Sequence, residues 1–379
     1  MSANRFSERR CCGGIAIVHR RTAVIVVVVG ALLAMVSGCG GAPTPAPSPT
    51  ADAAGQVLNI YNWDTYIDPV VLTDFEREFG VKIRYDLYEN NEAMLATVQA
   101  GSTDYDLVVP SDYMVEIMRG EGLLAPLDKN NIPNFQNLDS AFLSPAYDPG
   151  NRYCVPYQWG TLGIGYNAKA TGREITSIED LFDTAFAGRV ALLDDARETL
   201  GIVLLHLGYS PNTTNSAEIA QARDFLIEHS DQIAEYAPDT GQDLLADGTV
   251  DVAFEWSGDI FQVMADNADL RYVIPQEGSL IWTDNLCILA TAPHKEMAEK
   301  FINYVLKPEV GAAISNYIRF GSPNRAALPL LNREDRDNPA IYPSNQVQQR
   351  LFYLVNVGTA TTGLYEAAWA EVLAAKSGQ

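Results

Sequence analysis

Residues 57–110 read VLNIYNWDTYIDPVVLTDFEREFGVKIRYDLYENNEAMLATVQAGSTDYDLVVP, and this stretch decides the fold. Three runs in it are apolar or alternate between apolar and polar residues, as strands do: VLNIYN, VKIRYD and YDLVVP. Two helical patterns separate them, and the first places Val71, Phe75 and Phe79 on one face. Such alternation predicts an α/β fold whose sheet is rich in parallel strands and carries helices on both faces.

The same alternation returns in the second half of the chain. RVALLDD, VDVAFEW and RYVIP have strand patterns, and ARETLGIVLLHLG and SAEIAQARDFLIEH have helical ones. From about Met297 the tail is expected to be mostly helical, in the segments EMAEKFINYVL, SNQVQQRLFYLV and LYEAAWAEVLAA. A chain of 379 residues exceeds one average domain, so its length favours two lobes.

The first forty residues differ in composition from the rest. Five arginines precede an apolar run at 23–35, which is short for a membrane-spanning helix, and small residues follow it. Residues 36–39 read VSGC and resemble a bacterial lipobox. We therefore expect a lipoprotein signal peptide at 1–38 and lipidation of Cys39, with an ordinary signal peptide or a twin-arginine export signal as alternatives.

Residues 39–56 consist mostly of Gly, Ala, Pro, Ser and Thr. Such a segment buries too little apolar surface to fold, so it is predicted to be a disordered tether behind the lipidated cysteine. We expect an exported protein that is lipid-anchored to the outer face of the cytoplasmic membrane or lies in the periplasm.

The chain is acidic, with 48 Asp and Glu against 26 Lys and Arg and a formal net charge of −22. Removal of the basic signal would leave the remainder more acidic still. An acidic surface repels nucleic acid and anionic lipid and weakly attracts cations, so we expect no nucleic-acid partner.

Two of the five cysteines, Cys154 and Cys287, fall in the predicted folded part, both in strand-like apolar runs. An oxidising compartment would allow them to pair, but their long separation in sequence gives no distance. We expect two buried thiols, with a disulfide as the alternative.

Two stretches, AGSTDYDLVVPSDYM (100–114) and ADGTVDVAFEWSGDI (246–260), have the same plan: a helix end, a turn with Gly, an apolar strand led by Asp, and a turn with Ser into a helix. This similarity suggests two lobes built alike. In open α/β sheets the binding crevice lies at the carboxyl ends of the strands. The residues that follow the strands are therefore the candidates for function.

Carboxylates and aromatic rings gather at those positions. The predicted strand ends are followed by Trp63-Asp64-Thr65-Tyr66, Ser111-Asp112-Tyr113, 194–198 (DDARE), 255–259 (EWSGD) and Trp282-Thr283-Asp284. An alkylammonium needs carboxylates at its ends and aromatic faces along its methylenes. A charge-assisted hydrogen bond contributes about 1.5–3 kcal/mol, a desolvated cation–π contact up to about 2 and a buried methylene about 0.8. A diamine would thus reach the roughly −8 kcal/mol of a micromolar ligand. Helix capping by Asp and core packing by Trp are the alternative explanation for each residue taken singly.

The same residues carry a family resemblance. Tyr61-Asn62-Trp63, 106–111 (DLVVPS), 194–198 (DDARE), Trp282-Thr283-Asp284 and Ile341-Tyr342-Pro343 resemble the spermidine/putrescine-binding proteins of ABC uptake systems, and the resemblance extends from Leu58 to Lys376. It implies a two-lobed periplasmic-binding-protein fold of type II, with a hinge between the lobes. One lobe would comprise 57–162 and 284–351, and the other 163–283 and 352–379.

The resemblance also implies roles for individual residues. Trp63, Tyr66, Trp256 and Trp282 would form an aromatic box, Asp195, Glu198 and Asp284 would bind amino groups, and Ser111 and Tyr113 would complete the wall. Asp259 stands where the putrescine-preferring branch has a further carboxylate. Three positions depart from the family: Asp64-Thr65 reverses the usual order after the tryptophan, Phe320 replaces a tyrosine, and Leu354 replaces a glutamine of the spermidine branch. These changes affect which amine is bound rather than the amine class.

We therefore expect a monomeric binding protein that delivers a polyamine to an ABC permease and its ATPase, with no cofactor, metal or catalytic residue. A glycoside hydrolase using Asp195 and Asp284 is the enzyme alternative, but the G-x-S-x-G, H-E-x-x-H, P-loop and dinucleotide motifs are absent from the sequence. A polyamine-sensing lipoprotein, another cationic or zwitterionic solute, an anion, and ferric iron bound by Tyr66 and Tyr113 are further alternatives.

Overall fold

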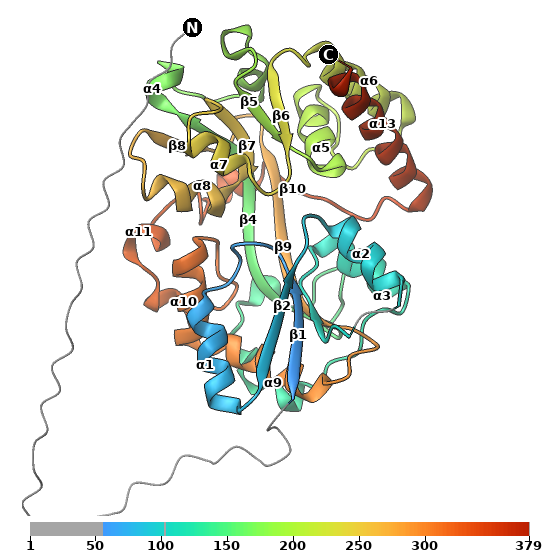
Figure 1. Ribbon diagram of the computed structural model, residues 1–379, viewed down its shortest axis with the longest axis vertical. Coiled ribbons are helices and arrows are strands. Elements are labelled where there is room, and N and C mark those ends of the chain that lie inside the picture. Colours follow the sequence, from blue (N-terminus) through green and yellow to red (C-terminus); the bar gives the residue numbers. More distant parts are fainter. Residues whose placement is uncertain (1–55, 102–103, 379) are drawn as a thin grey trace, which may run out of the picture. The chain divides into compact units, whose positions relative to one another are not determined.

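The computed structural model describes residues 56–101 and 104–378 (Figure 1). The expected signal peptide at 1–38, the lipidation site Cys39 and all but the last residue of the tether at 39–56 lie outside the described residues. Within the described ranges, no helix combines the length and the apolar character that crossing a membrane requires.

Strands from the whole described chain join one mixed sheet. Their order is β2-β1-β3-β9-β4-β7-β5-β6, with β10 paired to β9 and β8 paired to β4. Their bounds are β1 (Val57–Asn62), β2 (Lys82–Leu87), β3 (Leu107–Val108), β4 (Cys154–Asn167), β5 (Val190–Leu193), β6 (Ile233–Ala237), β7 (Val252–Trp256), β8 (Leu270–Val273), β9 (Ser279–Ile288) and β10 (Leu351–Tyr353).

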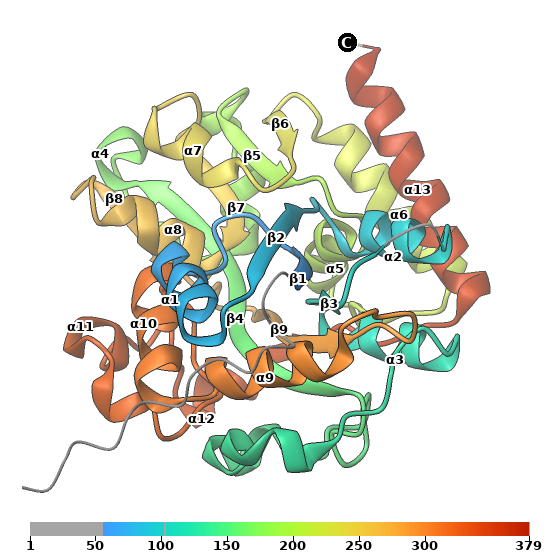
Figure 2. The same ribbon diagram turned by 60° about the horizontal axis from the view of Figure 1, so that its bottom comes forward.

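Helices flank the sheet on both sides, as predicted. Both views show α1 on one side of β1 and β2 and α2 on the other, and likewise α7 and α8 opposite α5, α6 and α13 around β5 (Figures 1 and 2). Their bounds are α1 (Pro69–Phe79), α2 (Asn91–Gln99), α3 (Asp112–Gly120), α4 (Ala168–Thr171), α5 (Ala196–His206), α6 (Ser216–Glu228), α7 (Gly241–Ala246), α8 (Ser257–Met264), α9 (Lys295–Val305), α10 (Pro308–Ile318), α11 (Arg333–Arg336), α12 (Asn345–Gln348) and α13 (Thr359–Ser377).

Helix α1 shows how local sequence produces these elements. Asp68 caps it by accepting from the amide of Val70, and Gly80 ends it in the left-handed conformation that glycine adopts without strain. Val71 and Phe75 are buried on the predicted face. Full burial of each such side chain contributes about 1.5–3 kcal/mol, which fixes α1 against the sheet.

The sheet has two similar halves. One reads β2-β1-β3-β9 and the other β6-β5-β7-β4, and in each half three parallel strands are followed by an antiparallel one. Strands β3 and β7 come from the two similar stretches of sequence and occupy the same third place. The carboxyl ends of equivalent strands can therefore supply equivalent side chains from each half.

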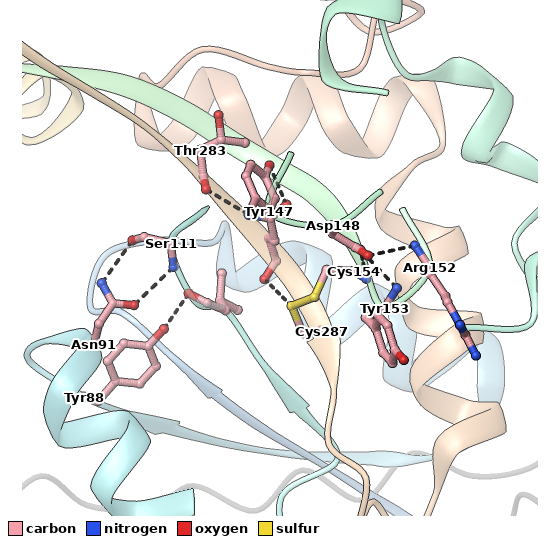
Figure 3. The surroundings of a disulfide bond; sticks show 12 residues. Tyr88, Asn91, Ser111, Tyr147, Asp148, Arg152, Tyr153, Cys154, Thr283 and Cys287 are labelled. Atoms are coloured by element: carbon pink, nitrogen blue, oxygen red, sulfur yellow. Dashed lines mark hydrogen bonds between the residues drawn. A yellow bond between two sulfur atoms is a disulfide. The ribbon is translucent and has the colours of Figure 1, made fainter. Parts of the chain in front are cut away.

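The long strand β4 joins the halves. It pairs with β9 from Cys154 to Thr161 and with β7 and β8 from Leu162 to Asn167. Cys154 and Cys287 are direct partners in the β4–β9 ladder, with Cα atoms 4.4 Å apart, and they form a disulfide (Figure 3). The expectation of two buried thiols was therefore wrong, because antiparallel pairing brings together residues that lie far apart in the chain.

The predicted helix at 344–355 is also corrected. Only Asn345–Gln348 is helical, and Leu351–Tyr353 form β10, which pairs in parallel with Ser279–Ile281 of β9. Strand β3 pairs with β9 only at Cys287 and Ile288, so the other end of β9 has an edge that β10 satisfies. An apolar run of this length fits a helix or a strand, and the available edge decided the outcome.

Candidate functional site

A cavity is lined mainly by residues that follow strand ends in both halves of the sheet, together with Trp282 and Asp284 from within β9. The lining comprises Trp63, Asp64, Tyr66, Ser111, Glu198, Asp239, Trp256, Asp259, Trp282, Asp284 and Phe320. All the predicted site residues except Tyr113 and Asp195 are among them. The rule that crevices form at the carboxyl ends of strands therefore located most of this lining from sequence. The expectation that Trp282-Thr283-Asp284 follow a strand end was wrong, because these residues lie within the long strand β9, paired with β4.

Asp284, in β9, is the most firmly held carboxylate of the cavity. The Tyr66 hydroxyl donates to its Oδ2 at 2.8 Å, and the Ser111 hydroxyl donates to its Oδ1 at 2.7 Å. Burial raises the pKa of Asp284 to about 7, although both hydrogen bonds favour the charged form and lower it. A cation in the cavity would restore the solvation that burial removes, so Asp284 is suited to bind one.

Glu198, in the first turn of α5, faces the same cavity. Its Oε1 accepts from the Trp256 indole at 3.3 Å, whereas its buried Oε2 has no hydrogen-bond partner among the described residues. Burial, followed by the charge of Asp195, raises the pKa of Glu198 well above its usual value. An unpaired buried carboxylate oxygen is costly to leave unsatisfied, and a ligand N–H would satisfy it.

Asp259 lies in the first turn of α8. Its Oδ1 accepts from Gln262 at 3.1 Å and from the Thr65 hydroxyl at 3.5 Å. Burial, with the charge of Asp239, raises the pKa of Asp259 well above its usual value. The contact with Thr65 links the loop after β1 to α8, so the two halves of the sheet meet at this carboxylate.

Aromatic rings form the walls between these carboxylates. The ring centroids of Trp63 and Trp256 are 6.0 Å apart, those of Trp282 and Phe320 are 5.0 Å apart, and those of Tyr66 and Phe320 are 5.5 Å apart. The Trp63 indole donates to the backbone oxygen of Val109 at 2.9 Å, which fixes that ring in place.

Two glycines make room for the rings. A Cβ at Gly160 would lie 2.7 Å from the Trp282 ring, and one at Gly258 would lie 2.6 Å from the Phe320 ring. Side chains at these positions would displace the two rings. The rings can keep their positions only because the glycine backbone allows them to approach it closely.

Asp195 and Tyr113 lie outside the lining. Asp195 caps α5 by accepting from the amides of Arg197 and Glu198, both at 2.8 Å, and it lines a separate cavity beside α13. The Tyr113 hydroxyl donates to Glu92 at 3.0 Å, and the ring lines a small neighbouring cavity. The helix-cap explanation thus holds for Asp195. The cavity that Asp284 and Tyr66 line is thus lined neither by Asp195, the other member of the acid–base pair, nor by Tyr113, the other member of the tyrosine pair.

Asp239 lines the cavity and was missed from sequence. It follows β6, whose sequence IAEYA we did not assign as a strand. The alternation of that segment and the turn-forming residues after it were the available signal. Asp239 would have been a candidate under the same strand-end rule.

The chemistry of the cavity is that of a binding site for an elongated organic cation. Five of its lining residues are carboxylates and five are aromatic, and within the described ranges no Lys or Arg lines it. In the same ranges no group of three or more His, Cys, Asp and Glu is arranged to hold a metal ion. Carboxylates bind ammonium groups and aromatic faces bind methylenes and cations, so the set fits an alkylammonium.

Comparison with known proteins agrees with this chemistry. The model of a family described as bacterial extracellular solute-binding proteins matches residues 71–341. The spermidine/putrescine-binding periplasmic protein of Salmonella typhimurium is 37% identical over 321 residues, which cover 84% of this chain and 92% of that protein.

Two solved structures show the same likeness. PotD, the spermidine/putrescine ABC transporter substrate-binding protein of Streptococcus pneumoniae, is 34% identical with a TM-score of 0.73, covering 85% of this chain and 99% of that chain. The TpPotD lipoprotein of Treponema pallidum is 31% identical with a TM-score of 0.75, covering 84% and 99%.

The fold and the site define a two-lobed solute-binding protein, in which a cavity is built from equivalent loops of two similar halves. The chain belongs to the family of bacterial extracellular solute-binding proteins. The two-lobed α/β fold and the family resemblance predicted from sequence are thereby confirmed. This is a family of solute-binding components of transport rather than a class of enzymes.

Proposed function

We propose that this protein captures a polyamine, putrescine or spermidine, between its two lobes and delivers it to an ABC permease with its ATPase. One observation carries the proposal: buried carboxylates with raised pKa values, Glu198, Asp259 and Asp284, surround a cavity walled by indole rings. Relatives named for spermidine and putrescine support it. A polyamine supplies both the positive charges and the methylene chain that such a cavity accommodates.

The proposed lobes are 57–162 with 284–351, and 163–283 with 352–379. Their boundaries fall inside β4, β9 and β10, the strands that connect the halves of the sheet. Bending of these strands would open and close the cavity, and the ligand would shift the population toward the closed form because only that form surrounds it. The protein would act as a monomer, without a cofactor.

Anchoring by lipid at Cys39, after removal of residues 1–38, is part of the proposal. The VSGC sequence supports it, and one of the similar structures is of a lipoprotein. The anchor and the tether at 39–56 would hold the binding lobes close to the permease at the membrane surface.

Calorimetric titration of the purified protein with putrescine, spermidine, spermine and 1-butylamine tests the function. We expect one-to-one binding of a diamine or triamine with a Kd in the micromolar range or below, roughly −8 kcal/mol or better. Asp284→Asn should weaken it by about 10- to 150-fold, the effect of one charge-assisted hydrogen bond. Asp266→Asn, an exposed change after α8 and outside the cavity, is the matched control. A folded wild-type protein that gives no heat with any of the amines would refute the proposal.

A further inference from the structure

The carboxylates of the cavity form two groups. Glu198 and Asp284 lie together, since Asp284 contributes to the raised pKa of Glu198. Asp64, Asp239 and Asp259 form the second group, since the charges of Asp239 and Asp64 both raise the pKa of Asp259. Tyr66 and Ser111 donate to Asp284, whereas Thr65 and Gln262 donate to Asp259, so the two groups have separate hydrogen-bond partners.

The second group comes from three different segments. Asp64 belongs to the loop after β1, Asp239 to the loop after β6, and Asp259 to the first turn of α8. Asp64 is therefore contributed by one half of the sheet and the other two by the opposite half. The three carboxylates repel one another when all are charged. A cation placed between them attracts each of them, which makes the total interaction favourable.

Asp239 lacks a partner for one of its oxygens. Its Oδ1 is buried and accepts no hydrogen bond among the described residues. Burial, followed by the charges of Asp64 and Asp243, raises the pKa of Asp239 to about 7. An unsatisfied acceptor that lines a cavity is positioned to accept from a ligand.

A further buried carboxylate stands behind this loop. Glu255 is fully buried, and its Oε2 also has no partner among the described residues. A Cβ at Gly241 would lie 2.3 Å from that Oε2, so glycine lets the loop carrying Asp239 pack against Glu255. Burial, followed by the charges of Asp259 and Asp239, raises the pKa of Glu255 well above its usual value, so Glu255 positions the loop by packing rather than by adding negative charge.

We propose that Asp239 is a ligand-binding residue that completes, with Asp64 and Asp259, a site for one terminal primary ammonium group and so selects dications over monocations. A primary ammonium has three N–H donors, one for each of three carboxylates. The second ammonium of the ligand lies at Glu198 and Asp284. This inference rests on the proposed function and adds to it a residue and the type of terminal group that it recognises.

Titration of wild type, Asp239→Asn, Asp239→Glu and Asp266→Asn with putrescine and 1-butylamine tests the inference. Asp239→Asn should weaken putrescine binding by about tenfold or more, while 1-butylamine, which needs only one acidic end, changes by less than about threefold. Asp239→Glu keeps the charge and should retain most of the selectivity. Asp266→Asn, an exposed change after α8 and outside the cavity, should leave the binding of both ligands unchanged.

Two outcomes separate this inference from the proposed function. If wild type binds putrescine and Asp239→Asn binds it within about twofold of wild type, or loses both amines equally, Asp239 does not select dications, and the function still stands. If wild type binds neither amine, the function fails and the inference fails with it. Circular dichroism of each variant shows that the comparison is made between folded proteins.

Discussion

At Asp284 the requirements of folding and of binding oppose each other. The carboxylate is 5% exposed, and burial penalises its charged form, but a cationic ligand needs that form. Tyr66 and Ser111 offset part of the penalty through their hydrogen bonds. The remaining penalty is relieved by protonation of Asp284 or by a positive charge that enters the cavity, so selectivity for cations follows from the burial itself.

Binding should therefore depend on pH. The pKa values of Asp239 and Asp284 are raised to about 7, so both carboxyls are largely protonated in the free protein at pH 5.5. Cation binding must then release protons, and we expect the affinity for putrescine to rise between pH 5.5 and 8, by at most about tenfold per pH unit for each proton released. Calorimetry at four pH values measures this. Equal Kd values at pH 5.5 and 7.5 would contradict it.

The raised pKa of Asp284 has the opposite effect on the stability of the ligand-free fold: that stability falls as pH rises. A carboxyl with a pKa near 4 in the unfolded chain and about 7 in the folded one binds more protons when folded. Its contribution to the free energy of unfolding is thus fully present below about pH 4 and is lost as pH rises through 7. The free energy of unfolding of the ligand-free protein should therefore fall across that window, and that of Asp284→Asn should fall by less.

At the scale of elements, the β4–β9 pair connects the two halves, and the disulfide joins these strands at Cys154 and Cys287 (Figure 3). Asp148 supports the same end, since its carboxylate accepts from the backbone amides of Arg152, Tyr153 and Cys154. Both the covalent link and these hydrogen bonds hold β4 in register with β9 next to Asp284. The strand that bears Asp284 therefore has a rigid support.

The double variant Cys154→Ser/Cys287→Ser should lower the free energy of unfolding by about 2–5 kcal/mol, because the cross-link restricts the unfolded chain over a long loop. Urea unfolding of the variant and of the oxidised wild type measures the difference. Both cysteines are buried, so dithiothreitol should leave the native disulfide intact without denaturant. The same urea midpoint for both proteins would show that the disulfide does not stabilise the fold.

At the scale of the whole molecule, Arg319 links the two halves on the side of the cavity formed by Phe320. Its guanidinium donates to the carbonyl of Phe261 in α8 at 2.9 Å and to Asp335 at 2.6 and 2.9 Å. Gln262 donates to the carbonyl of Ile318, at the end of α10, at 3.2 Å. These contacts join α8, which carries Asp259, to α10, and in the proposed lobe movement they would stabilise the closed form.

Arg319→Lys keeps the charge but loses the planar fork that reaches both partners at once. We expect putrescine to dissociate about tenfold faster from this variant, equivalent to about 1.4 kcal/mol of lost stabilisation of the closed form. Stopped-flow tryptophan fluorescence measures the rate. Arg336→Lys changes a more exposed arginine paired with Asp337 and should leave the rate unchanged. An unaltered dissociation rate for Arg319→Lys would show that the link does not hold the lobes closed.

Much of this protein could be predicted from sequence, because the relevant signals are local. Periodicity revealed most strands and helices, and the strand-end rule gathered residues as distant as Trp63 and Asp259 into one cavity. Residue type then determined the chemistry, since carboxylates beside indoles suit few ligands other than organic cations. The class of fold and the class of ligand are thus properties of the chain itself.

Tertiary structure decided which residues meet. Asp195 and Glu198 are three residues apart, yet one caps a helix and the other lines the cavity. Asp239 lines the cavity, Cys154 forms a disulfide with Cys287, and Leu351–Tyr353 form a strand at an open edge of β9. None of these follows from local pattern, because each depends on a distance or a free hydrogen-bonding edge that exists only once the two halves of the sheet are assembled.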